Sequence, residues 1–468
     1  MQGIYYGVFA FLLTVALVYG AMPLAVRYGF VDSPGAHKYH RKETPLVGGI
    51  AMFLGLAFTS LFMQFLNPSL IDVAAMLYAT ALIAIIGSLD DLYGLRVAPR
   101  LGAQILAGMI MAFWGGATLL DLGHVFGAQI VSLGMWAIPL TIFCYVGAMN
   151  AMNMVDGIDG SAGGIALISL SMLSIVAAQA GLHMDLALLL VLVGVVAGFW
   201  IFNVRLFGQQ HARVFMGDTG SMFLGLAIAW FLISLSQGEQ RAMTPVTALW
   251  IFALPLVDTI SVMLRRVFKR QSPFSADHGH FHHILSRAGF SVNKTVALMM
   301  GIQALMGGIG LMGLYAGVAE AVMFYVFFGI SIVYLIVTTY MWSSPARTGM
   351  EQRINKRKDF VLNVKLYLAN HEVKYLKSQD VSLGGVFINM AEIKVRLGSK
   401  VELAIQDPGN TGQEYRFTAR TVRITDNGVA FAFEYCNADN FRALQKLVFE
   451  KTTNYRKDPE VTRHALTS

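Results

Sequence analysis

The sequence predicts an all-α polytopic membrane protein with about eleven transmembrane helices, followed by a small cytoplasmic β-barrel. Of its 468 residues, 56% are hydrophobic and only 13% are charged, against ~25% charged in soluble domains. Long apolar stretches recur over residues 1–341, and alternating polar and apolar residues replace them in the tail. Residues 1–341 carry 15 Lys and Arg against 14 Asp and Glu, whereas residues 342–468 carry 20 against 14, so the basic excess lies in the tail.

The apolar stretches are each about 18–24 residues long, which is enough to cross a bilayer as a helix. The first of them lacks a basic start and a small-residue cleavage site, so we interpret it as a retained span and not as a signal peptide. The expected spans are 3–24, 47–66, 70–88, 101–119, 128–149, 161–180, 184–204, 219–236, 245–263, 295–316 and 320–341.

Basic residues alternate sharply between the loops that connect these spans. The odd-numbered loops hold 14 Lys and Arg, and the even-numbered loops hold only Arg241. Because cytoplasmic loops are enriched in Lys and Arg, we expect the odd loops and the C-terminal tail in the cytoplasm and the N-terminus outside. Cys144 lies in an apolar run and Cys436 in the tail. A structural disulfide is therefore not expected, which fits a reducing compartment for the tail.

The unusual polar clusters of the membrane part all fall in odd-numbered loops or at their edges. On the predicted topology they therefore face the same side of the membrane. The five clusters are DSPGAHKYHRKETPLVGG (32–49), SLDDLYGLR (88–96), NMVDGIDG (153–160), NVRLFGQQHARVFMGDTGS (203–221) and RRVFKRQSPFSADHGHFHH (265–283).

Each cluster also has a plain structural interpretation. An aspartate pair at a helix end is usually solvated, DGIDG can be a turn, and GDTGS can cap the following helix. DGIDG lacks the spacing and the closing Glu of an EF-hand. The histidines could ligate zinc, but no cysteine accompanies them. Asp258 lies two helical turns before Arg265. Its role is left open between a structural polar contact and the lining of the site.

Taken together, however, the clusters point to chemistry at the membrane face. Acidic residues near the membrane are costly and usually mark function. Carboxylates without cysteine suit a hard cation such as Mg²⁺. Nearby Arg, Lys and His suit phosphates, which need both metal and positive charge during phosphoryl transfer. This combination indicates a soluble nucleotide substrate that meets a lipid substrate.

Four motifs, SLDDLYGL, NMVDGIDG, RVFMGDTGS and HFHHILSRAGFS, occur in this order and are separated by membrane spans. Together they resemble the polyprenyl-phosphate N-acetylhexosamine-1-phosphate transferase family, which also includes the phospho-MurNAc-pentapeptide translocase. The likeness covers about residues 1–341, and the first-loop cluster is similar too. It implies an enzyme that moves a sugar-1-phosphate from a UDP-sugar to undecaprenyl phosphate and releases UMP.

The resemblance also implies roles for the acidic motifs. Asp90 and Asp91 match the family's paired aspartates and would bind or deprotonate the lipid phosphate, so that its oxygen attacks the sugar-proximal phosphate of the UDP-sugar. Asp218 of GDTGS would ligate Mg²⁺, with Asn153 as a second ligand and Mn²⁺ as the alternative metal. The catalytic machinery would thus be divided between the ends of several spans.

The two remaining motifs are implied to face the sugar donor. Asp156 and Asp159 would line the nucleotide and sugar pocket or help to hold the metal. The histidine motif and the residues around it resemble the N-acetylglucosamine-type members more than the translocase, so the expected donor is UDP-GlcNAc or a close N-acetylhexosamine relative. The substrate-binding set implied by the motifs consists of Lys42, His280, His282 and His283.

The sequence pattern changes after the membrane part, which we expect to occupy residues 1–341. A short polar linker is expected over residues 342–352, followed by a second domain over residues 353–468. Runs such as VKLYL, KVELAI and YRFTARTVRI alternate along the chain and are separated by turn residues, which is typical of a small β-barrel or sandwich. The stretch 441–457 is expected to form a closing helix.

Two short motifs mark the start of this second domain. QRINKRKDF contains Arg353 and Arg357 as RxxxR, and DVSLGG follows with Asp380, Ser382 and Gly385. RxxxR alone could be an anchor to anionic lipid, but the pair resembles the PilZ domain, whose RxxxR and [DN]xSxxG motifs bind cyclic di-GMP. Arginines can clamp phosphates and stack on guanine, and a carboxylate can accept a hydrogen bond from the guanine edge.

The predicted ligands and partners are UDP-N-acetylhexosamine, undecaprenyl phosphate, Mg²⁺, cyclic di-GMP and membrane lipid, with no nucleic acid and with a homodimer left open. The resemblance places the chain in the bacterial cytoplasmic membrane. Two rival functions stay open, a transporter or flippase for a phosphorylated substrate and an inactive membrane scaffold that responds to cyclic di-GMP. The polysaccharide that is primed and the sign of regulation are left open as well.

Overall fold

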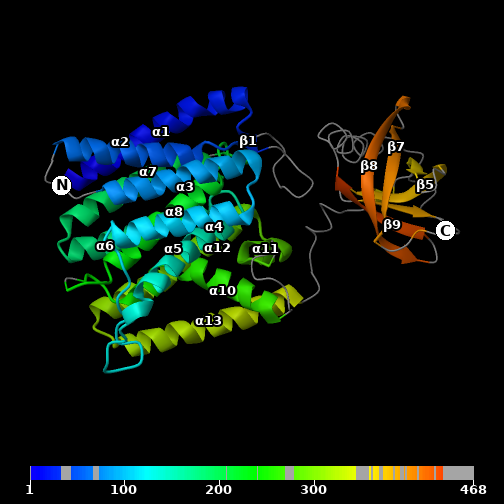
Figure 1. The fold of residues 1–468 in the computed structure, drawn as a ribbon. Helices are drawn as coiled ribbons and strands as arrows, with labels where there is room; N and C mark the ends of the chain where they lie inside the picture. The colour runs from blue at the N-terminus through cyan, green and yellow to red at the C-terminus, as the bar shows by residue number, and fades with distance from the viewer. Residues whose placement is uncertain are drawn as a thin grey trace. The chain divides into compact units, whose positions relative to one another are not determined.

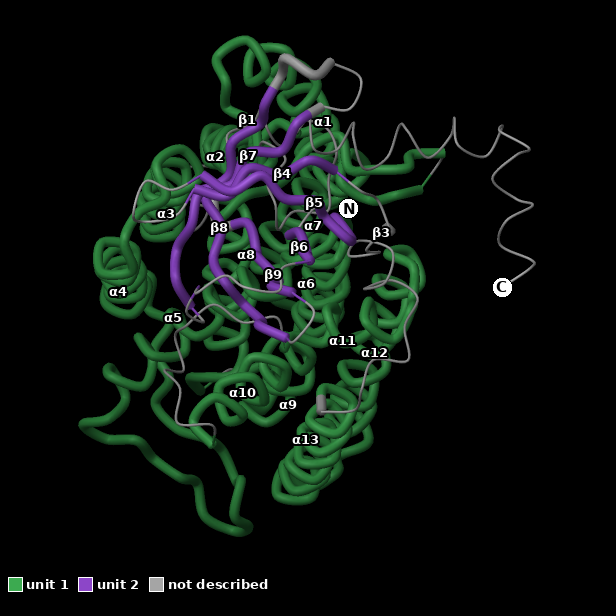
Figure 2. Tube along the Cα trace, turned by 90° about the vertical axis from the view of Figure 1, so that its right-hand side faces the viewer, with its two compact units in different colours: residues 1–32, 43–346 green, residues 33–42, 347–468 purple. Residues whose placement is uncertain are grey.

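The computed structural model describes two compact units (Figures 1 and 2). The helical unit contains all of the α-helices among the described residues, and the strand unit contains strands β3 to β9. The described residues are 2–32, 44–66, 73–206, 208–239, 241–268, 279–343, 358–359, 362–367, 373–382, 385–389, 395, 398–407, 410–425 and 428–435.

The helical unit contains thirteen described helices and one short strand pair. The pair joins β1 (Val31–Asp32) to β2 (Thr44–Pro45) in antiparallel register. The helices are α1 (Gln2–Tyr28), α2 (Gly48–Leu66), α3 (Ala74–Tyr93), α4 (Val97–Phe113), α5 (Ala137–Val155), α6 (Ser161–Gln179), α7 (His183–Asn203), α8 (Gly217–Ser234), α9 (Pro245–Ile251), α10 (Ala253–Phe268), α11 (Phe281–Arg287), α12 (Val292–Tyr315) and α13 (Glu320–Ser343).

Nine of the described helices are long and apolar enough to cross a membrane, and the pair α9 and α10 makes a tenth if it is counted as one span. The remaining predicted span, 101–119, corresponds to α4, which is apolar but only 17 residues long. The prediction of a polytopic helical membrane part is therefore confirmed, with some edges displaced by several residues.

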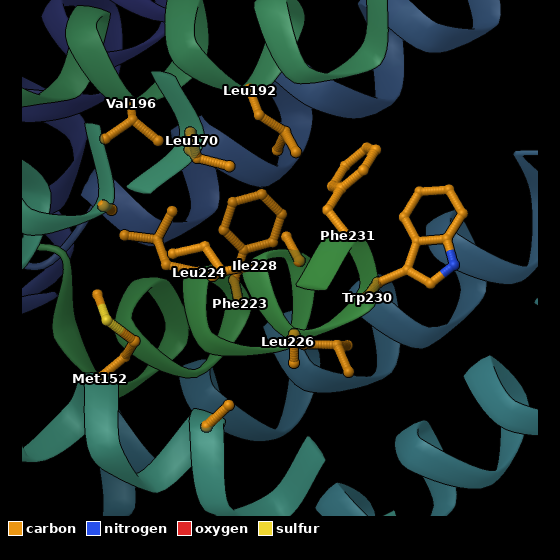
Figure 3. Close-up of a cluster of buried hydrophobic side chains, with 14 of the residues drawn as sticks. Met152, Leu170, Leu192, Val196, Phe223, Leu224, Leu226, Ile228, Trp230 and Phe231 are labelled. Carbon is orange, nitrogen blue, oxygen red and sulfur yellow. The ribbon is translucent and has the colours of Figure 1, made fainter. Parts of the chain in front are cut away.

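Helix α8 lies at the centre of the bundle, since 78% of its apolar stretch is buried. It is apolar around most of its circumference, as expected of a helix surrounded by protein. Figure 3 shows Phe223 and Phe231 of this helix among apolar side chains from its neighbours. A Cβ atom at Gly87 of α3 would lie 2.4 Å from the Cα of Thr219. This glycine lets the end of α3 approach the first turn of α8 closely.

The span that contains α9 and α10 is broken, and the two helices meet at an angle of 84°. Such a break exposes backbone groups that need partners. Gln303 of α12, which is fully buried, donates to the carbonyl of Ile251 at 2.6 Å and accepts from the N–H of Leu254 at 3.0 Å. The hydroxyl of Ser169 donates to the same Ile251 carbonyl at 2.9 Å. These hydrogen bonds set the direction in which α10 leaves the break.

The strand unit is an antiparallel β-barrel, as predicted. Six strands close in the order β4, β7, β8, β9, β6, β5, with β5 pairing back to β4, and β3 pairs with β5 beside them. Its core holds apolar side chains such as Leu366, Leu403 and Phe417. The strands are β3 (Lys358–Asp359), β4 (Asn363–Tyr367), β5 (Val373–Ser382), β6 (Gly385–Asn389), β7 (Lys400–Asp407), β8 (Asn410–Thr425) and β9 (Gly428–Tyr435).

Two predictions about this part of the chain lie outside the described residues. The predicted closing helix at 441–457 is one of them. Helix α13 ends at Ser343, and the next described strand, β3, begins at Lys358. Residues 342 and 343 of the predicted linker, 342–352, belong to α13. The other residues of that linker lie outside the described residues, and its bounds stay a prediction.

Candidate active site

The paired aspartates at the end of α3 have different surroundings. Asp90 is 7% exposed, and its Oδ1 accepts from the N–H of Leu95 at 2.6 Å. Its Oδ2 lies 2.7 Å from Nη1 of Arg100, in the first turn of α4. The same Nη1 lies 3.3 Å from Oδ2 of Asp218. One guanidinium group therefore joins the carboxylates of Asp90 and Asp218.

Asp91 contacts the beginning of α8. Its Oδ1 accepts from the N–H of Asp218 at 2.8 Å, and its Oδ2 accepts from the hydroxyl of Thr219 at 2.8 Å and from the Thr219 N–H at 3.3 Å. The first N–H groups of a helix lack intrahelical partners and attract negative charge. A Cβ at Gly217, where φ is +66°, would lie 2.3 Å from Oδ2 of Asp91. Glycine at this position allows α3 to supply the cap of α8.

Asp218 is the accessible carboxylate of this group. Its side chain is 32% exposed, against 4% for that of Asp90, so Asp218 can reach a ligand that Asp90 cannot. Its Oδ1 accepts from Nδ2 of Asn153 at 2.6 Å, and Asn153 also donates to the hydroxyl of Ser221 at 3.0 Å. The ends of α3, α5 and α8 thus meet at Asp218.

The two aspartates of DGIDG differ as well. Oδ2 of Asp159 accepts from Nε of Arg205 at 2.6 Å and from the N–H of Ala212 at 2.9 Å, so this carboxylate ties the α5–α6 loop to the α7–α8 loop. The carboxylate of Asp156 makes no hydrogen bond to the described part of the chain. Burial, and secondarily the negative charge of Asp218, Asp159 and Asp91, raises the pKa of Asp156 to about 8. The carboxylate of Asp159 is thus engaged by the α7–α8 loop, whereas that of Asp156 is not and has a raised pKa.

The histidine motif lies against the DGIDG loop. His282 is 2% exposed, and a Cβ at Gly157 would lie 2.1 Å from its Nε2. The His282 ring stacks on that of His280 at a centroid distance of 6.0 Å and lies 4.1 Å from that of His283. The glycine between the two aspartates thus makes room for the histidine motif, which begins α11.

Asp258 of α10 anchors the same motif. It is 2% exposed, its Oδ2 lies 2.9 Å from Nδ1 of His280, and its Oδ1 accepts from the N–H of Phe281 at 3.1 Å. Arg265, two turns further along α10, donates to the carbonyl of Gly279 at 2.5 Å. Of the two interpretations left open by the sequence, Asp258 is a polar contact that orients a predicted substrate-binding histidine.

Four of the ten residues predicted for this site, Asn153, Asp90, Asp91 and Asp218, are therefore brought together, Asp90 through Arg100, and Asp156 lies within electrostatic reach of Asp218 and Asp91. Lys42 lies outside the described residues. The sequence assigned no role in the site to Arg100, which counted only among the basic residues of the odd-numbered loops. Its position nine residues after Asp91, at the start of the next helix, was the available signal.

The donor chemistry of the site fits Mg²⁺. Mg²⁺ prefers oxygen ligands and is usually held by one or two carboxylates together with substrate phosphates. Asp218 supplies a half-exposed carboxylate, and the amide of Asn153 lies beside it. Among the described residues, no group of three or more His, Cys, Asp or Glu is arranged to hold a metal ion. Substrate phosphates would therefore have to complete the coordination sphere.

The second candidate site lies on the hairpin formed by β5 and β6. Register pairs Ser382 with Gly385, and Asp359 of β3 with Asp380. Lys358, the residue directly after Arg357, pairs with Val381. A Cβ at Gly385 would lie 2.2 Å from the carbonyl oxygen of Phe431, so this position requires glycine. The sheet thus places Lys358 and Asp359, the residues that follow the RxxxR motif in sequence, next to DxSxxG.

The arginines of that motif, Arg353 and Arg357, lie outside the described residues, as does the side chain of Ser382. Their predicted contacts with cyclic di-GMP stay predictions. Asp380 and Gly385 are described, and both lie at the end of the β5–β6 hairpin where the register places β3.

Comparison with known proteins identifies both units. The glycosyl transferase family 4 model matches residues 73–236, and the PilZ domain model matches residues 351–450. The undecaprenyl-phosphate alpha-N-acetylglucosaminyl 1-phosphate transferase of Yersinia pestis is 36% identical over 307 residues, which cover 65% of this chain and 83% of the relative. The protein of the same name from Haemophilus influenzae is 34% identical over 324 residues, which cover 68% and 89%.

A solved structure, the PilZ domain of CeSA from a cellulose-synthesizing bacterium, is 20% identical over 20% of this chain and 97% of that one, with a TM-score of 0.18. A score this low carries no argument about the strand unit.

The fold and the site together define a polytopic membrane protein with a cluster of acids and histidines at helix ends and a C-terminal β-barrel. The chain belongs to the polyprenyl-phosphate N-acetylhexosamine-1-phosphate transferases of glycosyl transferase family 4, and it carries a C-terminal PilZ domain. The resemblance predicted from the four motifs is confirmed.

Proposed function

We propose that this chain transfers GlcNAc-1-phosphate from UDP-GlcNAc to undecaprenyl phosphate, releases UMP and so primes a cell-surface polysaccharide. The observation that carries the proposal is the meeting of Asp218, Asp90, Arg100 and Asn153 at the ends of four different helices. The names of the relatives, which are 34–36% identical to this chain, support the donor and the acceptor. The loop charges support catalysis on the cytoplasmic side, with the N-terminus outside.

The reaction exchanges one phosphoanhydride bond for another, and the ester bonds to the sugar and to the lipid stay intact. An oxygen of the lipid phosphate forms a bond to the sugar-proximal phosphorus of UDP-GlcNAc. The bond from that phosphorus to the bridging oxygen breaks, and UMP leaves with the electron pair. Because negative charge gathers on the transferred group, positive side chains aimed at it stabilise the transition state.

Arg100 supplies positive charge next to the accessible carboxylate. Asp90 lies 2.7 Å from this guanidinium and is itself nearly inaccessible, so it holds Arg100 in place. We assign Arg100 to the phosphate of the lipid acceptor. Asp91 has both oxygens engaged by α8, and we assign it the role of holding Asp218 in position.

Asp156 is the carboxyl suited to proton transfer. A catalytic acid or base works best when its pKa lies near the operating pH, and burial raises the pKa of Asp156 to about 8. We assign its ionised form, whose population grows as the pH rises toward 8, to accept the proton of a singly ionised lipid phosphate. Asp159 stays outside the chemistry because Arg205 and the N–H of Ala212 engage it.

The metal site and the histidines would hold the nucleotide end. Asp218 and Asn153 would hold Mg²⁺, which supplies positive charge to the diphosphate when it is bound. His282 contacts the DGIDG loop at Gly157, and the His280 ring stacks on that of His282. We assign the diphosphate of the donor to this motif, with the partly exposed His283 in contact with it and the buried His280 and His282 holding the motif in position.

The PilZ domain would bind cyclic di-GMP. Gly385 lets the β5–β6 hairpin pack closely on β9, and β3, which begins directly after Arg357 in sequence, pairs with β5 at Asp380 and Val381. Arg353 and Arg357 would clamp the phosphates, while Asp380 and Ser382 would accept and donate at the guanine edge. We propose that this binding regulates the transferase.

The test is release of UMP by purified full-length protein given undecaprenyl phosphate, Mg²⁺ and a panel of UDP-sugars. We expect turnover with UDP-GlcNAc and a loss of at least a hundredfold in Asp218→Asn. Glu239→Gln, at an exposed residue beyond the opposite end of α8 from Asp218, serves as the matched carboxylate control. Turnover of only the MurNAc-pentapeptide donor would refute the donor assignment, and movement of substrate without UMP release would favour a transporter.

A further inference from the structure

Helix α13 contacts the histidine motif at both ends of α11. The hydroxyl of Tyr334 donates to Oδ1 of Asp258 at 2.9 Å, and the Tyr334 ring lies 5.6 Å from that of Phe281, the first residue of α11. The guanidinium of Arg287, the last residue of α11, lies 4.4 Å from the ring centroid of Trp342. The short helix that carries His282 and His283 is therefore held between α10 and α13.

Asp258 is shared between these elements. Its Oδ2 contacts His280, and its Oδ1 accepts from both the Phe281 N–H and the Tyr334 hydroxyl. A buried carboxylate is stabilised only while its hydrogen-bond partners stay in place. If Tyr334 moves away, Asp258 loses one of three donors, and the position of the His280 ring changes with it.

Helix α13 is also the spanning helix with the least buried surface. Only 11% of its apolar stretch is buried, against 78% of that of α8. An element with few buried contacts costs little free energy to displace. It is the last described helix before the strand unit, and Trp342 lies one residue before its end at Ser343. In Figure 1 it runs alongside α10, and α11 lies near its C-terminal end.

We infer that Asp258 and Tyr334 are positioning residues that couple the C-terminal end of α13 to the histidines. A change at the start of the PilZ domain would then alter the grip on the donor diphosphate through α13, without any contact between that domain and the substrate. This inference rests on the proposed function, because it gives the histidines the diphosphate and the PilZ domain cyclic di-GMP. It names the route by which regulation reaches the site.

The experiment measures UMP release by the full-length protein against UDP-GlcNAc concentration, with and without saturating cyclic di-GMP. Tyr334→Phe removes the hydroxyl alone. The matched control is Tyr325→Phe, on the same helix, where an exposed ring contacts Phe324 and the substitution keeps that contact. Trp342→Leu removes the ring next to Arg287 and so tests the outer contact separately. Cyclic di-GMP affinity of each full-length variant is measured in parallel.

The loss of a hydrogen bond to a charged group changes an equilibrium constant by about tenfold. Tyr334→Phe is therefore expected to lower kcat/KM for UDP-GlcNAc about tenfold, mainly through KM. Its KM should no longer respond to cyclic di-GMP, although its affinity for that nucleotide equals that of the wild type. Trp342→Leu should lose the response with a smaller change in basal KM, and Tyr325→Phe should behave as wild type.

The inference is overturned if Tyr334→Phe has the same KM and the same response to cyclic di-GMP as the wild type. In that case, UMP release by the wild type would still support the proposed function. Wild-type protein that binds cyclic di-GMP and turns over at an unchanged rate would overturn the coupling. Absence of UMP release from the wild type would overturn the proposed function and the inference with it.

Discussion

Replacing Asp91 with Asn tests whether this carboxylate holds α8 or the lipid phosphate. In the structure Oδ2 of Asp91 accepts from the Thr219 hydroxyl at 2.8 Å and from the Thr219 N–H at 3.3 Å. An amide group has an acceptor at only one of the two oxygen positions, so either these hydrogen bonds or that from the Asp218 N–H to Oδ1 at 2.8 Å is lost, and the substitution also removes a negative charge from the start of α8. The predicted primary defect is therefore a displaced first turn of α8, which carries Asp218.

The size of the effect follows from the lost contacts. A hydrogen bond to a charged group contributes about 1.5–3 kcal/mol, and a negative charge at a helix N-terminus about 0.3–1 kcal/mol. These contributions are not additive, so we expect Asp91→Asn to lower the free energy of unfolding by about 2–4 kcal/mol. The assay is equilibrium unfolding in detergent micelles, combined with Thr219→Val in a double-mutant cycle. The coupling between the two changes should be about 1 kcal/mol or more.

Steady-state kinetics separate the two roles of Asp91. If it positions Asp218, Asp91→Asn lowers kcat by about tenfold or more while KM for undecaprenyl phosphate stays within about twofold. An unchanged free energy of unfolding, together with a large rise in KM for the lipid, would refute this reasoning and show that Asp91 binds the phosphate directly.

Three further predictions follow from the contacts. Because the pKa of Asp156 is raised to about 8, the folded state keeps a proton that the unfolded state loses above about pH 4. The wild type should therefore lose stability relative to Asp156→Asn as the pH rises from 5 to 8. Thermal unfolding of both proteins in detergent without metal measures this difference in stability. Gln303→Leu leaves both the N–H of Leu254 and the carbonyl of Ile251 without this partner and should lower the free energy of unfolding by about 1–3 kcal/mol, whereas Gln303→Glu, which keeps an acceptor and a donor when its carboxyl is protonated, should lose less at acid pH. Gly385→Ala places a methyl group 2.2 Å from the carbonyl of Phe431, and calorimetric titration should show at least a tenfold loss of cyclic di-GMP affinity.

The sequence predicted the parts of the fold that depend on apolar length and period. The spans and the period-two tail follow directly from hydropathy, and the loop charges placed every polar motif on one face. The break between α9 and α10 does not follow from hydropathy, because the stretch 245–263 is long enough to form one span. Its local cause is Pro255, which has no N–H to donate to the carbonyl of Ile251 four residues earlier. The tertiary contribution is Gln303 of another helix, which satisfies the freed backbone groups.

The sequence predicted which residues form the candidate site, but it did not predict the contacts that each of them makes. Asp90 and Asp91 are adjacent, and neighbouring side chains on a helix point about 100° apart. One therefore faces Arg100 and the other faces α8, a difference that no motif expresses. The role of Asp258 was equally hidden, because its partners His280 and Tyr334 lie 22 and 76 residues away in sequence.

The central claim is that the sugar and its phosphate move together onto the lipid. The most direct test uses UDP-GlcNAc that carries radioactive phosphorus in the sugar-proximal phosphate and a second label in the sugar, with undecaprenyl phosphate and Mg²⁺. The account predicts that both labels enter the lipid fraction in equal amounts, that unlabelled UMP is released and that EDTA abolishes transfer. Transfer of the sugar label alone, with release of labelled UDP, would contradict it.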